Sequence, residues 1–129
     1  MGKSTKRVMK EKQESFKPLI YICAPYRGDV AKNIEDAIRY AEFAYQQGNV
    51  PITPHLFFPF LNEEKEEHRQ DALAMDLILL GKCQEVWVFG SEITEGMQVE
   101  LAVSKRRRQT IRYFSKDCKE VQHENRSRE

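Results

Sequence analysis

Two acidic residues are candidates for chemistry because each lies among apolar neighbours. Glu100 lies beside Met97 and Leu101 on the wheel of a predicted helix, and Asp76 lies in the apolar segment Met75–Leu77. If both acids face one cleft, they form the pair of carboxylates that glycosyl transfer uses, with one as nucleophile and the other coupling protons or positioning. The alternative is that each is an ordinary helix acid in contact with solvent.

A second candidate site is the loop that follows the first predicted strand, Ala24–Asp29. The backbone N–H groups of a strand-to-helix loop and of the helix that follows can bind an anion. Arg27 can hold a phosphate or carboxylate through two parallel hydrogen bonds. The loop has neither the Walker A pattern nor the Gly-x-Gly-x-x-Gly pattern. On spacing alone an ordinary turn with a solvated Arg27 is the more common case, and an anion contact is the alternative.

The loop Gly90–Met97 is the third candidate region. Thr94 can cap the helix that contains Glu100, and Gly96 leaves room for a ligand to approach the backbone. His55 ends another strand, where a lone histidine is either structural or a ligand contact. Tyr21 lies inside the first strand, where a core role is the simplest interpretation.

The elements that must position these residues alternate along the chain. Continuous apolar runs predict strands, whereas helical periodicity predicts helices. The predicted strands are Leu19–Cys23, Val50–Thr53, Glu85–Phe89 and Thr110–Phe114, and the predicted helices are Asn33–Gln47, Ala72–Leu80 and Gly96–Lys105. This order predicts an α/β fold, a doubly wound parallel sheet of four to five strands with helices on both faces. Ligands of such sheets bind at the carboxyl ends of the strands, where the three loops Ala24–Asp29, Thr53–Phe60 and Gly90–Met97 lie.

We expect one folded domain, residues 18–115, between two polar ends. Met1–Lys17 is rich in Lys, Glu, Gln and Ser without an apolar period, which predicts a mobile N-terminal tail. Residues 116–129 have the same character, with a weak helical tendency over Asp117–His123. A net charge of +1 gives no field that favours a nucleic acid or an anionic membrane as partner. The basic run Lys105–Arg108 closes a helix, where cations suit the dipole, and it lacks interleaved aromatic residues.

The composition also excludes several classes of protein. The apolar runs are too short to span a bilayer, and the basic N-terminus lacks the apolar stretch of a secretory signal. Cys23, Cys83 and Cys118 are an odd number without a Cys-x-x-Cys pair, which argues against a disulfide framework and a zinc site. We therefore expect a cytoplasmic protein.

Taken in order, these segments resemble the nucleoside 2-deoxyribosyltransferase superfamily, which includes the deoxynucleoside monophosphate N-glycosidases. The chain looks most similar to an uncharacterised DUF4406-type branch with the same Glu-Gly-Met signature. The resemblance extends from Leu19 to Phe114. It rests on Tyr21–Gly28, Thr53–His55, the helix with Asp76, Val86–Gly90 and Glu95–Leu101.

The resemblance implies a flavodoxin-like sheet and a homo-oligomer whose active site is completed by a neighbouring subunit. It implies a small-molecule nucleoside or nucleotide as ligand, without a metal or an organic cofactor. Glu100 matches the nucleophile that attacks the anomeric carbon, Asp76 the acid that assists the leaving base, and Tyr21 the residue that orients the nucleophile. A base then resolves the intermediate in a transferase, and water does so in a hydrolase.

The resemblance also implies a substrate-binding set. Arg27 and Gly28 match residues of the phosphate pocket, and Thr94 and Gly96 lie where a Ser and a Gly do the same. Ala24, Pro25 and His55 complete the predicted binding residues.

Three departures from the family pattern bear on this prediction. Ala24-Pro25 replaces the usual Gly-Pro or Gly-Ser, and Gln84-Glu85 stands where an Asp is usual. Residues 116–129 contain no counterpart of the residue that transferases contribute from a neighbour, which weakens a transferase more than a hydrolase. Two alternatives stay open, namely a non-catalytic nucleotide-binding module and an NAD-type glycohydrolase.

Overall fold

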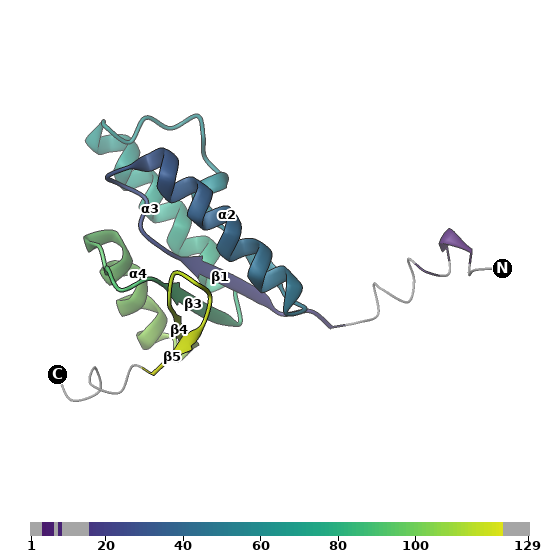
Figure 1. Ribbon diagram of the computed structural model, residues 1–129. Coiled ribbons are helices and arrows are strands. Elements are labelled where there is room, and N and C mark those ends of the chain that lie inside the picture. Colours follow the sequence, from purple (N-terminus) through teal and green to yellow (C-terminus); the bar gives the residue numbers. More distant parts are fainter. Residues whose placement is uncertain (1–3, 7, 9–15, 123–129) are drawn as a thin grey trace.

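Strands and helices alternate in the computed structural model as the apolar patterns predict (Figure 1). The structure describes residues 4–6, 8 and 16–122. Its elements are β1 (Leu19–Cys23), α2 (Val30–Gln46), β2 (Val50–Ile52), the 3-10 turn η1 (Pro54–Leu56), α3 (Glu66–Gly81), β3 (Glu85–Phe89), α4 (Glu95–Arg106), β4 (Thr110–Phe114) and β5 (Glu120–Val121). Within these described residues, no helix is long and apolar enough to cross a bilayer.

The sheet has the strand order β2-β1-β3-β4-β5. The first four strands in this order are parallel, and β5 is antiparallel to β4. The chain leaves β1 toward β2 on one side and later returns to β3 on the other. The topological switch point therefore lies at the carboxyl ends of β1 and β3, as in other flavodoxin-like sheets. The predicted α/β fold is confirmed.

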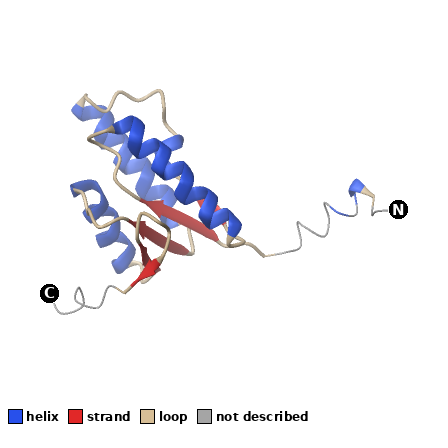
Figure 2. Cartoon of the chain, in the orientation of Figure 1, coloured by secondary structure: helices blue, strands red, loops and turns tan. Residues whose placement is uncertain are grey.

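Helices cover both faces of this sheet (Figure 2). On one face, Tyr40 and Ala44 of α2 pack against a cluster that includes Ile22 and Phe89. On the other face, Leu80 at the end of α3 and Met97 of α4 belong to a second apolar cluster. Because successive strand residues point to opposite faces, each central strand contributes to both clusters.

Helix α2 begins at Val30, ahead of the predicted start at Asn33. The Asp29 side chain accepts a hydrogen bond from the backbone nitrogen of Lys32 at 3.2 Å and caps the helix. The segment from Val30 to Lys32 lacks the apolar spacing of a helix, so periodicity alone places the start of α2 too late.

Helix α3 begins at Glu66, well before the predicted Ala72. Glu66 and Glu67 occupy the first turn, where negative charge suits the positive end of the helix dipole. The charged segment therefore extends the helix. Strand β2 ends one residue early, at Ile52, because η1 begins at Pro54.

The weak helical tendency predicted over Asp117–His123 is wrong for the described residues 117–122. Glu120–Val121 forms β5, with Val121 opposite Tyr113. Arg112 of β4 pairs with Glu120, with 2.7 Å between Nη2 and Oε1, and this contact links segments that the local pattern cannot relate. Residues 123–129, and all but a few of residues 1–15, lie outside the described residues, so the predicted mobility of both ends stays a prediction.

Candidate active site

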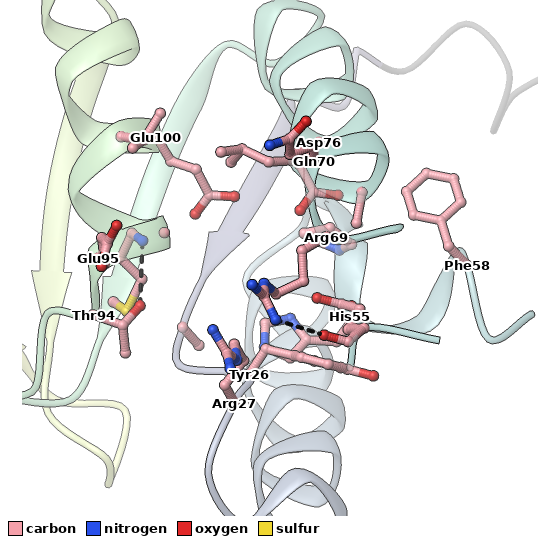
Figure 3. A pocket seen from close by; sticks show the side chains of 18 of the residues that line it. Tyr26, Arg27, His55, Phe58, Arg69, Gln70, Asp76, Thr94, Glu95 and Glu100 are labelled. Atoms are coloured by element: carbon pink, nitrogen blue, oxygen red, sulfur yellow. Dashed lines mark hydrogen bonds between the residues drawn. The ribbon is translucent and has the colours of Figure 1, made fainter. Parts of the chain in front are cut away.

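A cavity of about 680 Å³ opens at the switch point of the sheet (Figure 3). Its wall is made by the loop after β1, by η1 and the following loop, by α3, and by the start of α4. All three loops predicted from the parallel-sheet rule therefore contribute to one cavity. The predicted residues that line it are Ala24, Arg27, Gly28, His55, Asp76, Thr94, Gly96 and Glu100.

Glu100 is buried, with 7% of its surface exposed, and both of its carboxylate oxygens have donors on β1. The Tyr21 hydroxyl donates to Oε2, and the Cys23 thiol donates to Oε1 at 3.5 Å. Burial raises the pKa of Glu100 to about 7, and the two hydrogen bonds oppose that rise because they favour the ionised form. Tyr21 itself lies beneath Glu100 and has no exposed surface.

The N-terminal cap and the apolar residues of α4 set the position of Glu100. The Thr94 hydroxyl accepts a hydrogen bond from the backbone nitrogen of Met97 at 3.2 Å, which confirms the predicted cap. Met97 and Leu101 of the same helix are buried in the apolar cluster, and Glu100 lies between them on the wheel. The apolar anchors therefore orient the carboxylate toward β1 and the cavity.

Asp76 faces the same cavity from α3, and Figure 3 shows its carboxylate and that of Glu100 directed into the space between the two helices. Its Oδ1 atom is buried without a hydrogen-bond partner in the structure. Burial is the main cause that raises the pKa of Asp76 to about 8, and the negative charges of Glu100 and then Glu63 add to it. At neutral pH, Asp76 therefore holds its proton while Glu100 is partly ionised.

Two arginines lie away from the acids, on the side of the cavity where Tyr26 and His55 lie (Figure 3). Arg27 was predicted, whereas Arg69 of α3 was not. Both positive charges lower the pKa of Glu63, although the partial burial of this carboxyl is the larger effect and raises it. Arg69 also forms an ion pair with Glu66. The cavity thus has Asp76 and Glu100 in one part, and Arg27 and Arg69 together with Glu63 and Glu66 in another.

The loop that presents Arg27 is held by contacts of its own backbone. The Asn33 side chain donates to the carbonyl oxygens of Tyr26 and Arg27, each at 3.0 Å. Gly28 follows with a φ of +102°, a conformation that residues with a Cβ rarely adopt. The predicted glycine is therefore required by the turn that exposes Arg27 to the cavity.

His55 connects this loop to η1. Its Nε2 donates to the Pro25 carbonyl oxygen at 2.8 Å, and its ring packs edge-on against Tyr26 with 5.1 Å between centroids. Burial lowers the pKa of His55, which keeps the ring neutral at pH 7. Pro25 is outside the cavity lining and contributes through this carbonyl. Both residues hold the loop in place, and His55 also lines the cavity.

Sequence reasoning missed several residues of the site, and two of them had a usable signal. Arg69 lies seven positions before Asp76, two helical turns along the same face of α3. Cys23 lies two positions after Tyr21, on the same face of β1. Within the described part of the chain, no group of three or more His, Cys, Asp or Glu side chains is arranged to hold a metal ion.

The fold and the cavity define a flavodoxin-like α/β domain with a pair of carboxylic acids at its switch point, of which Glu100 is buried and Asp76 half-buried. The chain belongs to the family described as domain of unknown function DUF7768, whose model matches residues 18–114. The matched span contains β1 to β4 and every cavity residue named above. The comparison with curated proteins gives no match to this chain. The relation to nucleoside deoxyribosyltransferases therefore stays a prediction from the motifs.

Proposed function

We propose that this protein cleaves the N-glycosidic bond of a nucleoside or nucleotide, with Glu100 as the nucleophile. The observation that carries the proposal is that the carboxyls of Glu100 and Asp76 line one cavity, with Glu100 held by two donors of β1 and the Asp76 Oδ1 atom buried without a hydrogen-bond partner. Two carboxyls in different environments can divide the roles of nucleophile and acid, and burial raises the pKa of both.

In the first step, an oxygen of ionised Glu100 attacks the anomeric carbon and the bond from that carbon to the base nitrogen breaks. The electron pair stays on the base, which takes the proton of Asp76 as it leaves. In the second step, water attacks the anomeric carbon, Asp76 accepts the proton of that water, and Glu100 leaves as a carboxylate. Two displacements return the original configuration at the sugar. A transferase differs only in that a second base replaces water.

The two arginines of the cavity support a phosphorylated substrate. Arg27 and Arg69 both contribute to the lining, away from Asp76 and Glu100, and a phosphate would compete with Glu66 for Arg69. A nucleoside monophosphate has its reacting carbon at one end of the sugar and a dianion at the other. Guanidinium groups bind such a dianion through paired charge-assisted hydrogen bonds. We therefore favour a monophosphate over the free nucleoside.

The proposal includes a homo-oligomer in the cytoplasm. Phe57 and Phe60 follow η1 near the cavity and are 42% and 74% exposed, which supports coverage by a second copy of the chain. Cys23, Cys83 and Cys118 are free thiols, which supports a reducing compartment. Light scattering of the purified chain tests the assembly, and a monomer at micromolar concentration contradicts it.

The test of the activity is the release of free base, followed by chromatography. The protein is incubated separately with nucleosides, deoxynucleosides, their monophosphates and NAD. We expect release from at least one monophosphate, a loss of about 10⁴-fold or more in Glu100→Gln, and normal release in the matched control Glu42→Gln, an exposed acid of α2. Arg27→Ala and Arg69→Ala should each raise KM for the monophosphate about tenfold.

Four outcomes contradict the proposal. If no compound releases a base, or if Glu100→Gln keeps full activity, Glu100 is not the nucleophile. Thermal stabilisation by a monophosphate without product indicates the non-catalytic binding module instead. Release of nicotinamide from NAD alone indicates the glycohydrolase.

A further inference from the structure

The carboxylate of Glu100 is held by two side chains of one strand, and the family resemblance gives a role to only one of them, Tyr21. Tyr21 donates to Oε2 and Cys23 donates to Oε1 at 3.5 Å. Tyr21 and Cys23 are two positions apart on β1, so both point to the same face of the sheet. Neither has any exposed surface. The second contact is therefore a built-in part of the site.

We propose that Cys23 is a positioning residue, which holds Oε1 of Glu100 through its thiol proton while Tyr21 holds Oε2. The last torsion of a glutamate side chain is broad, because it joins a tetrahedral carbon to a planar carboxylate. A single hydrogen bond at Oε2 leaves rotation about this bond, whereas donors at both oxygens fix the plane of the carboxylate. A nucleophile needs that orientation toward the anomeric carbon.

The surroundings keep the Cys23 thiol in its donor form. Burial is the main cause that raises the pKa of Cys23 well above its ordinary value, and the charge of Glu100 adds to it. The other titratable groups that face Glu100 are Tyr21 from β1 and Asp76 from α3. Burial likewise raises the pKa of Tyr21 well above its ordinary value. Both donors on β1 therefore keep their protons through the neutral range.

Two substitutions separate a positioning role from simple packing. Cys23→Ser keeps a donor but reduces the apolar volume, whereas Cys23→Val keeps apolar volume but removes the donor. If the thiol only fills space, Cys23→Val is the milder change. If the thiol positions Glu100, Cys23→Ser is the milder change. Cys23→Ala removes the donor without adding an atom that could clash, so the comparison survives if the valine variant does not fold.

Cys83 is the matched control. It is also buried, at 6% exposed, and belongs to the same apolar cluster as Cys23. Its thiol contacts the Leu79 carbonyl oxygen at 3.4 Å. Cys83→Ser and Cys83→Val make the same chemical changes in the same core without touching the carboxylate.

The inference rests on the proposed function only in that Glu100 is the nucleophile. One arm of the experiment therefore needs no turnover. In that arm the full chain carries isotope-labelled glutamate carboxyl carbons, and Glu100 is titrated by nuclear magnetic resonance. Its signal is assigned by its absence in Glu100→Gln. In the second arm, the acid limb of the pH profile of kcat/KM is measured for base release.

We expect Cys23→Val and Cys23→Ala to raise two midpoints by about one pH unit, that of the Glu100 resonance titration and that of the acid limb of kcat/KM. The reason is that a hydrogen bond to the ionised form of Glu100 is lost. Cys23→Ser and both Cys83 variants should titrate close to the wild type. The proposal is overturned if Glu100 titrates in Cys23→Val and Cys23→Ala as it does in the wild type. It is also overturned if Cys23→Ser shifts the Glu100 midpoint as far as Cys23→Val does. A chain that releases no base contradicts the proposed function, and the resonance titration still decides the role of Cys23.

Discussion

One face of the sheet, under α2, is filled with aromatic rings, whereas the opposite face, under α3 and α4, contains two carboxylic acids. On the first face, Phe89 stacks between Tyr40 and Phe114, with centroids at 4.3 Å and 5.1 Å. On the second, Glu100 is buried against Tyr21 of the same sheet. Because neighbouring residues of one strand point to opposite faces, tight packing on one side coexists with a reactive cavity on the other.

The pleat of single strands therefore separates the residues that stabilise the fold from those of the proposed chemistry. Phe89 and Phe114 pack at the carboxyl ends of β3 and β4, beneath the loops that form the cavity. Burial of rings is favourable, whereas burial of a carboxyl costs free energy unless the group stays protonated or finds donors. Substitutions on the ring face should therefore change stability, and substitutions on the acidic face should change rate and pH dependence.

The largest expected effect on stability is on the ring face. Phe89→Ala removes a fully buried ring with two stacking partners and should lower the free energy of unfolding by about 4 kcal/mol. Urea denaturation measures it, with Ile38→Ala, an apolar residue of α2 that is 50% exposed, as the control with little loss. A loss for Phe89→Ala as small as that of the control breaks the comparison.

Asp76→Asn should have the next largest effect, and on rate. The amide cannot supply the proton to the leaving base, so kcat/KM for base release should fall about 10²- to 10³-fold, or roughly 3–4 kcal/mol of activation free energy. Asp71→Asn is the matched control, since Asp71 is an exposed acid of the same helix. Activity within twofold of the wild type in Asp76→Asn removes the proposed acid.

The free energy of unfolding should depend on pH through the two acids, Glu100 and Asp76, and not through the ring face. The pKa values of Glu100 and Asp76 are raised to about 7 and about 8, so the folded state binds more protons than the unfolded state above about pH 4. Stability is therefore highest below the unfolded pKa values, falls as pH rises toward 8, and is level above. Each pH unit over which one of these acids is protonated only in the folded state is worth about 1.4 kcal/mol, so we expect a loss of several kcal/mol between pH 5 and pH 9, measured by denaturation at each pH.

The double variant Asp76→Asn, Glu100→Gln should flatten that slope, since neither amide titrates. Ile38→Ala should keep it, because that residue lies on α2, on the ring side of the sheet. An unchanged slope in the double variant shows that other groups cause the pH dependence.

The smallest expected effect is at the cap of α4. Thr94→Ala removes the oxygen that accepts from the Met97 backbone nitrogen and should cost about 1 kcal/mol of stability. Thr94→Ser keeps that oxygen and should cost less. Thermal denaturation compares the two, and equal losses would show that the methyl group rather than the cap matters.

Most of the architecture could be predicted because it depends on local patterns. Apolar runs identify β1 and β3, since strands buried on both faces have no polar alternation. The parallel order then selects the loops at the carboxyl edge. The starts of α2 and α3 were harder, because a cap and a charged first turn extend a helix without an apolar period. Strand β5 depends on the contact of Glu120 with Arg112, which no local pattern contains.

The sequence by itself determined that Glu100 and Asp76 lie on helices among apolar neighbours, and that their loops meet at one edge of a sheet. Only the tertiary structure decided that both acids face one cavity, that Tyr21 and Cys23 lie beneath Glu100, and that Arg69 joins Arg27. The physical reason is that periodicity identifies which side of a helix is apolar, whereas the packing of α3 and α4 on the sheet sets which side chains meet. Burial, and with it the raised pKa values of the two acids, follows from that packing.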